Sequence, residues 1–216
     1  MTVGSTPRTR VHRLPERAVT DEQTLHDILD AGLVAHVSVV TDGQPYVIPV
    51  GYARRGGEVV FHGSRASRLF RTLSTGQPMC FTVTLLDGLV LARSAFNSSM
   101  NYRSVMVLGT PRLLTGDEEL AALEAVSEHL IPGQWQHIRQ PSAQERKATT
   151  TLALSLDECS IKVRTGEPHD DAEDVTALSH VWAGVVPIRE VFDEPVPAPD
   201  CAAGVEVPPH VRDWVR

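Results

Sequence analysis

Cysteine is scarce in this sequence, and the three cysteines that occur lie far apart. Cys80, Cys159 and Cys201 form no Cys-x-x-Cys pair, so the chain has neither the even set of a disulfide framework nor the thiolate pairs of a zinc site. The nine histidines are also scattered, and none has a His or Cys partner at metal-ligand spacing. We therefore expect no locally built metal site and a reducing, cytoplasmic compartment.

An excess of positive charge and long apolar runs are missing as well. The formal net charge is -7, whereas binding to a phosphate backbone normally needs a clustered positive surface. The one basic cluster, at Arg8, Arg10, Arg13 and Arg17, lies near the N-terminus, and we assign it to a partly mobile arm. No segment approaches the ~20 apolar residues of a membrane span, and the first residues hold no apolar signal-peptide core. We expect a soluble protein that binds neither nucleic acid nor membranes.

The sequence also lacks the short motifs of several enzyme classes. It contains no Gly-x-Ser-x-Gly elbow, no His-Glu-x-x-His pair, no Walker loop and no Gly-x-Gly-x-x-Gly. A Ser-His-Asp site assembled from distant positions stays open, although no pattern indicates one.

Short β-branched stretches separated by glycine turns dominate what is present in these 216 residues. We expect strands over residues 34–41, 45–52, 58–64, 78–96, 104–114, 152–166 and 182–192. Helical periodicity predicts helices over residues 20–33, 63–73, 117–130 and 142–150, the first opened by a capping box of Thr20 and Gln23. Residues 166–175 are expected to be an exposed loop, and the proline-rich tail to lack regular structure. This order favours a mainly β fold with added helices, in which an antiparallel sheet forms a barrel in one domain. It does not favour a doubly wound sheet.

The stretch GSRASRLFRTL, residues 63–73, carries three arginines at three-residue spacing. Ser67 and Arg68 lie in the first turn of the expected helix, where free backbone N–H groups and the positive dipole end favour an anion. The fork geometry of arginine suits a phosphate. We expect a cofactor phosphate here, with Arg68 as its anchor, Arg71 as a helper and Arg65 directed to solvent. The alternative is a solvated helix face.

A second polar stretch, SAFNSSMNYRSV at residues 94–105, lies between two apolar strands. Its density of hydrogen-bond donors is unusual where a barrel should close. The stretch is either part of a binding site or a long polar hairpin loop.

Three stretches in order, GQPYVIPVGY, VVFHGSRASRLFRTL and VTLLDGLVLARSAFNSSMNYRSVMVLG, closely resemble the pyridoxamine 5'-phosphate oxidase-like flavin-nucleotide-binding family, which includes nitroimidazole reductase-like proteins. The likeness runs from about Leu14 to Phe192. It implies an FMN-binding split β-barrel, an antiparallel barrel of Greek-key type, in a homodimer with the flavin at the subunit interface. On this basis the chain divides into an N-terminal arm (1–17), a flavin-binding split-barrel domain (18–193) and a Pro-rich C-terminal tail (194–216).

The resemblance also implies a cofactor site, which combines a strand beside the isoalloxazine ring, the end of the next strand, a Ser-Arg pair that holds the phosphate, and a strand contributed by the partner subunit. Carried onto this sequence, the residues are Val47, Ile48, Pro49, Val50, Phe61, His62, Ser67, Arg68, Arg71, Tyr102, Arg103 and Ser104. His62, Tyr102 and Arg103 are the catalytic candidates. Ser104 falls where the oxidase has a glutamine.

The implied activity is that of an FMN-dependent oxidoreductase acting on a small acceptor. Ile48 and Ala53 stand where the vitamin B6 oxidase carries basic residues, and its C-terminal tryptophan-and-arginine signature is missing around Trp182. Oxidation of pyridoxamine phosphate is therefore not expected.

Three alternatives stay open. FAD could replace FMN, because only the shared phosphate is visible in the motif. The chain could be a non-catalytic flavin or haem carrier, with His36 as an axial-ligand candidate, or use a deazaflavin coenzyme, because one fold hosts several functions. It could also be a homodimer whose flavin site has decayed.

Overall fold

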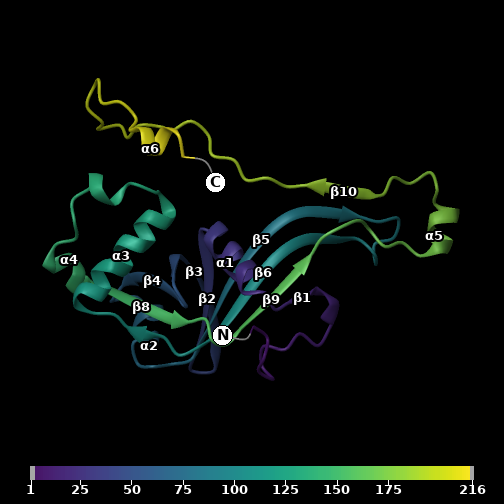
Figure 1. Cartoon of the computed structure of the whole chain (residues 1–216), viewed down its shortest axis with the longest axis horizontal. Helices are drawn as coiled ribbons and strands as arrows, with labels where there is room; N and C mark the ends of the chain where they lie inside the picture. Colours follow the sequence, from purple (N-terminus) through teal and green to yellow (C-terminus); the bar gives the residue numbers. More distant parts are fainter. Residues whose placement is uncertain (1–2, 215–216) are drawn as a thin grey trace.

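The computed structural model describes residues 3–214, which form a curled ten-stranded sheet with helices around it (Figure 1). The strands are β1 (Ala18–Val19), β2 (Val34–Thr41), β3 (Gln44–Arg55), β4 (Glu58–Ser64), β5 (Met79–Leu91), β6 (Ser99–Gly109), β7 (Arg112–Leu113), β8 (Thr149–Ser155), β9 (Cys159–Arg164) and β10 (Gly184–Pro187). The helices are α1 (Glu22–Ala31), α2 (Arg68–Leu73), α3 (Gly116–Leu130), α4 (Ala143–Ala148), α5 (Ala172–Ala177) and α6 (Pro209–Arg212), with 3-10 turns η1 (Pro15–Arg17) and η2 (Trp135–His137).

The sheet follows the order β1-β9-β6-β5-β2-β3-β4-β8-β7, with β10 added beside β5. Every pairing is antiparallel, so the expected mainly β, antiparallel fold is confirmed. β3 is shared by two halves, because residues 44–51 pair with β2 and residues 52–55 pair with β4. The sheet therefore splits along β3.

The main core lies on one face of the sheet. Along β2, Ala35, Val37 and Val39 are buried while the residues between them are more exposed, as the two-residue period of a strand requires. Tyr52 and Phe61 pack around Phe81, with ring centroids 5.1 and 5.9 Å from it. Burying each such large side chain stabilises the fold by about 1.5–3 kcal/mol.

α1 begins one residue later than the sequence pattern predicts. The carboxylate of Asp21 accepts a hydrogen bond from the backbone N–H of Thr24 at 2.7 Å, and a carboxylate there also meets the positive end of the helix dipole. The predicted capping box of Thr20 and Gln23 is therefore wrong, because the backbone turns into the helix at Asp21 and not at Thr20.

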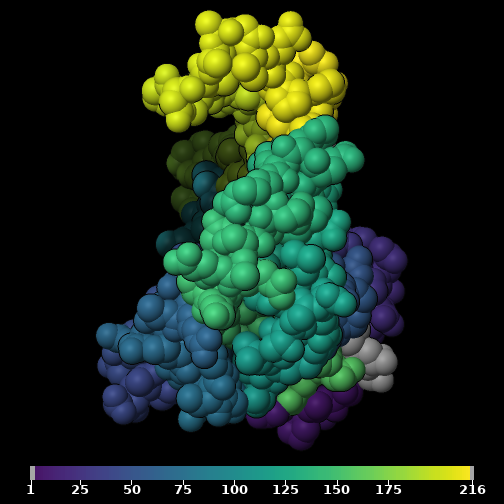
Figure 2. Space-filling view, turned by 90° about the vertical axis from the view of Figure 1, so that its left-hand side faces the viewer, coloured from purple at the N-terminus to yellow at the C-terminus, as the bar shows by residue number. Residues whose placement is uncertain are grey.

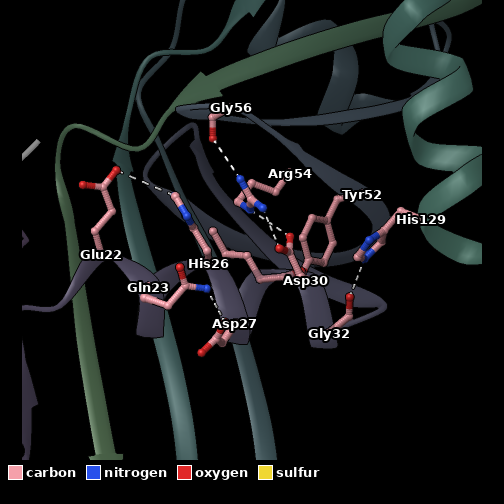
Figure 3. A network of polar contacts seen from close by, with 11 residues as sticks. Glu22, Gln23, His26, Asp27, Asp30, Gly32, Tyr52, Arg54, Gly56 and His129 are labelled. Carbon is pink, nitrogen blue, oxygen red and sulfur yellow. Dashed lines mark hydrogen bonds and ion pairs between the residues drawn. The ribbon is translucent and has the colours of Figure 1, made fainter.

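Polar contacts then fix α1 against β3 and α3 (Figure 3). Arg54 donates to both oxygens of Asp30, at 2.8 and 2.6 Å. The hydroxyl of buried Tyr52 donates to the carbonyl oxygen of Leu29 at 2.7 Å. His129 of α3 contacts the carbonyl oxygen of Gly32, the residue that directly follows α1.

A smaller core joins α3 to the face of β3, β4 and β8 that points away from the main core. It comprises Ala53, Val60, Leu114, Ala122, Val126 and Ala153. α3 and α4 thus cover one side of the molecule together with α2 (Figure 1).

The chain ends depart most from the sequence expectations. Gly4 donates its backbone N–H to the carbonyl oxygen of Cys159 at 2.8 Å, so the N-terminal segment packs on β9. The acidic stretch 166–175 contains the start of α5, and the proline-rich tail contains α6, so neither is free of regular structure. α6 starts with Pro209, at a position where proline loses no helical hydrogen bond.

The tail runs from β10 across one end of the molecule to α3 (Figure 1). There the ring of His210 stacks on His137, with centroids 4.6 Å apart, and its Nε2 lies 2.7 Å from Oε1 of Gln134. Within residues 3–214, no helix has the length and apolar character needed to cross a membrane.

Candidate functional site

A hollow of about 570 Å³, here named the split hollow, opens between β3 and β4. Residues 46–51 of β3 and residues 62–64 of β4 face this hollow. They do not pair with each other, because the β3 stretch pairs with β2 and the β4 stretch pairs with β8. α2 closes one end. The lining residues are Val39, Tyr46, Ile48, Pro49, Val50, Gly51, His62, Gly63, Ser64, Ser67, Arg68, Leu69 and Phe70.

The first turn of α2 is held rigidly against β4. Oγ of Ser67 accepts a hydrogen bond from the backbone N–H of Phe70 at 3.3 Å, which caps the helix. The ring of Phe70 packs directly on Gly63, where an added Cβ would lie only 2.1 Å from Cε2 of that ring. Glycine at this position is what lets α2 approach the strand.

Arg68 follows the cap and extends over the ring of Tyr46, with its guanidinium carbon 4.5 Å from the ring centroid. Such a cation–π contact is worth about 0.5–1 kcal/mol at an exposed site. None of the carboxylates described between residues 3 and 214 forms an ion pair with Arg68. The hollow therefore combines apolar walls with a positioned, uncompensated cation.

His62 stands at the rim of the split hollow. Solvent reaches the side chain, while desolvation by the surrounding protein lowers the pKa of its imidazole. The ring is therefore held neutral at neutral pH, so it can offer one nitrogen as a donor and the other as an acceptor or ligand. Among the described residues no cluster of three or more metal-ligating side chains occurs.

Half of the predicted cofactor residues come together in this hollow. They are Ile48, Pro49, Val50, His62, Ser67 and Arg68. Tyr46 was missed by the sequence analysis, although it lies two residues before Ile48 and so on the same face of β3.

Three other predicted residues lie nearby without lining the hollow. Val47 points to the opposite face of β3 and is 58% exposed. Phe61 is fully buried in the core, where it packs on Phe70 with ring centroids 6.0 Å apart. Arg71 lines a different hollow together with Arg65.

The β6 residues Tyr102, Arg103 and Ser104 lie on a separate part of the sheet, because β5 and β2 stand between β6 and β3. Nη2 of Arg103 lies 2.7 Å from Oδ1 of Asp87, and this pairing raises the pKa of the arginine. The hydroxyl of Ser104 lies 3.1 Å from that of Thr84. One protomer alone does not bring these residues to the split hollow.

Comparison with protein families finds a match over residues 21–163 to the family described as pyridoxamine 5'-phosphate oxidase. A comparison with curated proteins finds no match.

Solved structures of similar fold include two with 41% sequence identity. The match to the flavocytochrome Anf3 from Azotobacter vinelandii covers 100% of this chain and 99% of that chain, with a TM-score of 0.91. The match to the FAD and heme binding protein from Mycobacterium smegmatis covers 91% of this chain and 96% of that chain, with a TM-score of 0.87.

A more distant structure, a candidate 5-nitroimidazole antibiotic resistance protein from Bacteroides thetaiotaomicron, shares 19% identity. The match covers 68% of this chain and 86% of that chain, with a TM-score of 0.56. At this identity the likeness concerns the fold alone.

Proposed function

The chain belongs to the pyridoxamine 5'-phosphate oxidase family, and we propose that it is a flavin-nucleotide-binding oxidoreductase whose flavin lies in the split hollow. The observation that carries the proposal is the pairing, in one hollow, of an apolar wall at residues 48–50 with Arg68 beside the capped start of α2. A flavin nucleotide has the same two parts, a flat, largely apolar ring and a phosphate.

FAD is the flavin we propose, in place of the FMN expected from the sequence. The relative from Mycobacterium smegmatis, which matches nearly the whole chain at 41% identity, is described as binding FAD.

Each part of the split hollow has a distinct role in this proposal. A bound flavin would supply the redox chemistry, taking electrons from a reductant and passing them to a small acceptor. Ile48 and Val50 exclude water from the ring, Arg68 neutralises the phosphate, and His62 is the side chain placed to hydrogen-bond a ring edge or the acceptor.

Haem binding is a second candidate function, favoured by the two relatives described as a flavocytochrome and as an FAD and heme binding protein. A histidine that holds haem iron must offer a neutral imidazole nitrogen, and the haem itself needs apolar groups around it. His62 meets this requirement in the split hollow. His36 is exposed on β2 between Val34 and Val40, so it meets the requirement only if another surface covers that face.

A homodimer is also part of the proposal. Val34 and Val40 of β2 lie on the same face as Val47 of β3, because residues paired across strands share a face. These three valines are 49%, 58% and 58% exposed. They share this face with His36 and Ser38, and exposed apolar side chains gathered on one face are typical of an interaction surface. The family resemblance implies that a second copy contributes its β6 residues to the flavin site.

The absorbance spectrum of the purified protein tests the cofactor assignment, supplemented by titration with FAD and with haemin. We expect flavin bands; if haem is instead the occupant of the split hollow, haemin gives a Soret band that His62→Ala removes and His36→Ala retains. Loss of the Soret band only in His36→Ala would move the haem ligand to β2. A protein that binds no flavin would overturn the proposed function.

Size-exclusion chromatography with light scattering tests the dimer. The wild type should run as a dimer and Val47→Glu as a monomer, because the buried charge would be unpaired. A monomeric wild type would overturn this part of the proposal.

A further inference from the structure

A second hollow, of about 750 Å³, lies on the side of the molecule formed by α2, α4 and β8. It is named the basic hollow here because Arg65, Arg71, Arg146 and Lys147 line it. Figure 2 looks onto this side, where teal and green residues of α3 and α4 lie beside the blue residues that precede β5. Nothing in the proposed flavin site uses these four cations.

The charges of the basic hollow are not balanced by the protein. Its one carboxylate, Glu119, is occupied by Arg146, whose Nε lies 3.1 Å from Oε2. No ion pair joins Arg65, Arg71 or Lys147 to a carboxylate within residues 3–214. Cations gathered around one space repel each other unless an anion enters it.

The cations come from opposite walls, and their backbone is fixed. Arg71 belongs to α2 and Lys147 to α4. The backbone N–H of Arg65 donates to the carbonyl oxygen of Ala148 at 2.9 Å, which ties the two walls together. An anion between the walls would therefore be contacted from both sides.

A buried hydroxyl provides an independent indication of a ligand. Thr151 of β8 is 1% exposed, and its Oγ1 has no hydrogen-bond partner among the described residues. By the alternation of a strand, its side chain shares a face with Ala153, which packs towards α3. Buried hydroxyls are almost always hydrogen-bonded, and Thr151 lines the basic hollow.

We propose that the basic hollow binds the diphosphate of a nucleotide. Arginine forks and hydroxyl donors are the groups that recognise phosphate oxygens. The volume, about 750 Å³, is that of a small-molecule site and exceeds what a single phosphate ion fills. Exposed Leu113 and Ala143 add an apolar surface for a base.

Two sources could supply this diphosphate. One is the adenosine diphosphate half of FAD, reaching past α2 from the split hollow, and this source rests on the proposed function. Arg68 and Arg71 lie three residues apart on α2, within about 60° of each other around its axis. Arg68 lines the split hollow and Arg71 lines the basic hollow. The other source is a separate nucleotide that binds while the flavin is in place.

Calorimetric titration of the full chain with ADP tests the inference, with the protein as purified and after removal of flavin. We expect binding to at least one form, weakened about 10- to 100-fold in the double variant Arg71→Gln/Lys147→Gln, the scale of lost charge-assisted hydrogen bonds. The control Arg55→Gln/Arg189→Gln removes two exposed cations that line neither hollow and should bind as the wild type does.

The two sources give different patterns. If the hollow holds the FAD tail, ADP binds only the flavin-free protein, and the double variant weakens FAD but not FMN. If the nucleotide is separate, ADP binds the flavin-loaded protein. Absence of ADP binding to both forms, or equal binding by the double variant and its control, would overturn the inference. A protein that binds ADP but no flavin would contradict the proposed function and leave this inference standing.

A second variant, Thr151→Val, keeps the side-chain shape and removes the hydroxyl. Because Oγ1 has no protein partner in the described chain, stability should not fall, while ADP affinity should fall about 2- to 10-fold. Lower stability with unchanged ADP affinity would show that the hydroxyl serves the fold and not the ligand.

Discussion

Gly63→Ala is the substitution that tests most sharply how α2 is positioned. The new Cβ would lie 2.1, 2.7 and 2.8 Å from three ring carbons of Phe70. These separations are below any normal contact, and Phe70 is only 4% exposed with Phe61 behind it. The ring must therefore move, and α2 with it.

The cost can be set from the behaviour of overpacked cores. Forcing a methyl group into a well-packed site destabilises a protein by about 1–3 kcal/mol. For a domain of this size each kcal/mol shifts Tm by about 2–4 °C, so we expect Tm to fall by about 2–12 °C. Flavin affinity should fall too, because Ser67 and Arg68 move with α2.

Gly57→Ala is the matched control. Gly57 directly precedes β4, and an added Cβ there meets nothing within 4 Å. Thermal unfolding followed by circular dichroism compares the two variants with the wild type. If Gly63→Ala proved as stable as Gly57→Ala, the close packing of α2 on β4 would be refuted.

Three further predictions concern stability and reactivity. Desolvation lowers the pKa of His62 from 6.5, so the unfolded chain binds this proton more readily and stability should fall as pH drops below 6.5. Urea unfolding should show a smaller pH dependence in His62→Gln, and an equal dependence would contradict the desolvation of the ring. Burial raises the pKa of the Cys159 thiol to about 11, whereas Cys201 is exposed. Mass spectrometry after thiol alkylation should therefore find Cys201 modified first and Cys159 modified only on unfolding. The reverse order would be incompatible with the packing of β9. Tyr52→Phe removes the buried hydrogen bond to Leu29 and should cost about 0.5–1.5 kcal/mol in urea unfolding; no loss would mean that this bond adds nothing net.

Local features of the site could be predicted from the sequence. The apolar face of Leu69, Phe70 and Leu73 follows from the spacing of residues within a single helix, and the structure buries all three. The expected helix start at residue 63 is wrong, because β4 continues to Ser64 and Ser67 caps the helix. The strand character of β2, β3 and β4 likewise follows from β-branched residues and glycine turns nearby in the chain.

The division of the arginines could not be predicted in this way. Arg68 lines the split hollow and Arg71 lines the basic hollow. This division depends on how α2 packs between β4 and α4, and those two elements are far apart in the sequence. The split in β3 depends on long-range pairing with β2 and β4. The α1 cap failed for a simpler reason, since Thr20 and Asp21 are both good caps and only the backbone decides between them.

The central claim, that a flavin nucleotide binds in the split hollow through Arg68, is tested most directly by titrating flavin-free protein with FAD and following flavin fluorescence. Arg68→Gln should raise the Kd about 10- to 100-fold, the scale of a lost charge-assisted contact with phosphate, while Arg55→Gln, an exposed arginine outside both hollows, should leave it unchanged. Equal FAD affinity in the wild type, Arg68→Gln and Arg55→Gln would contradict the account.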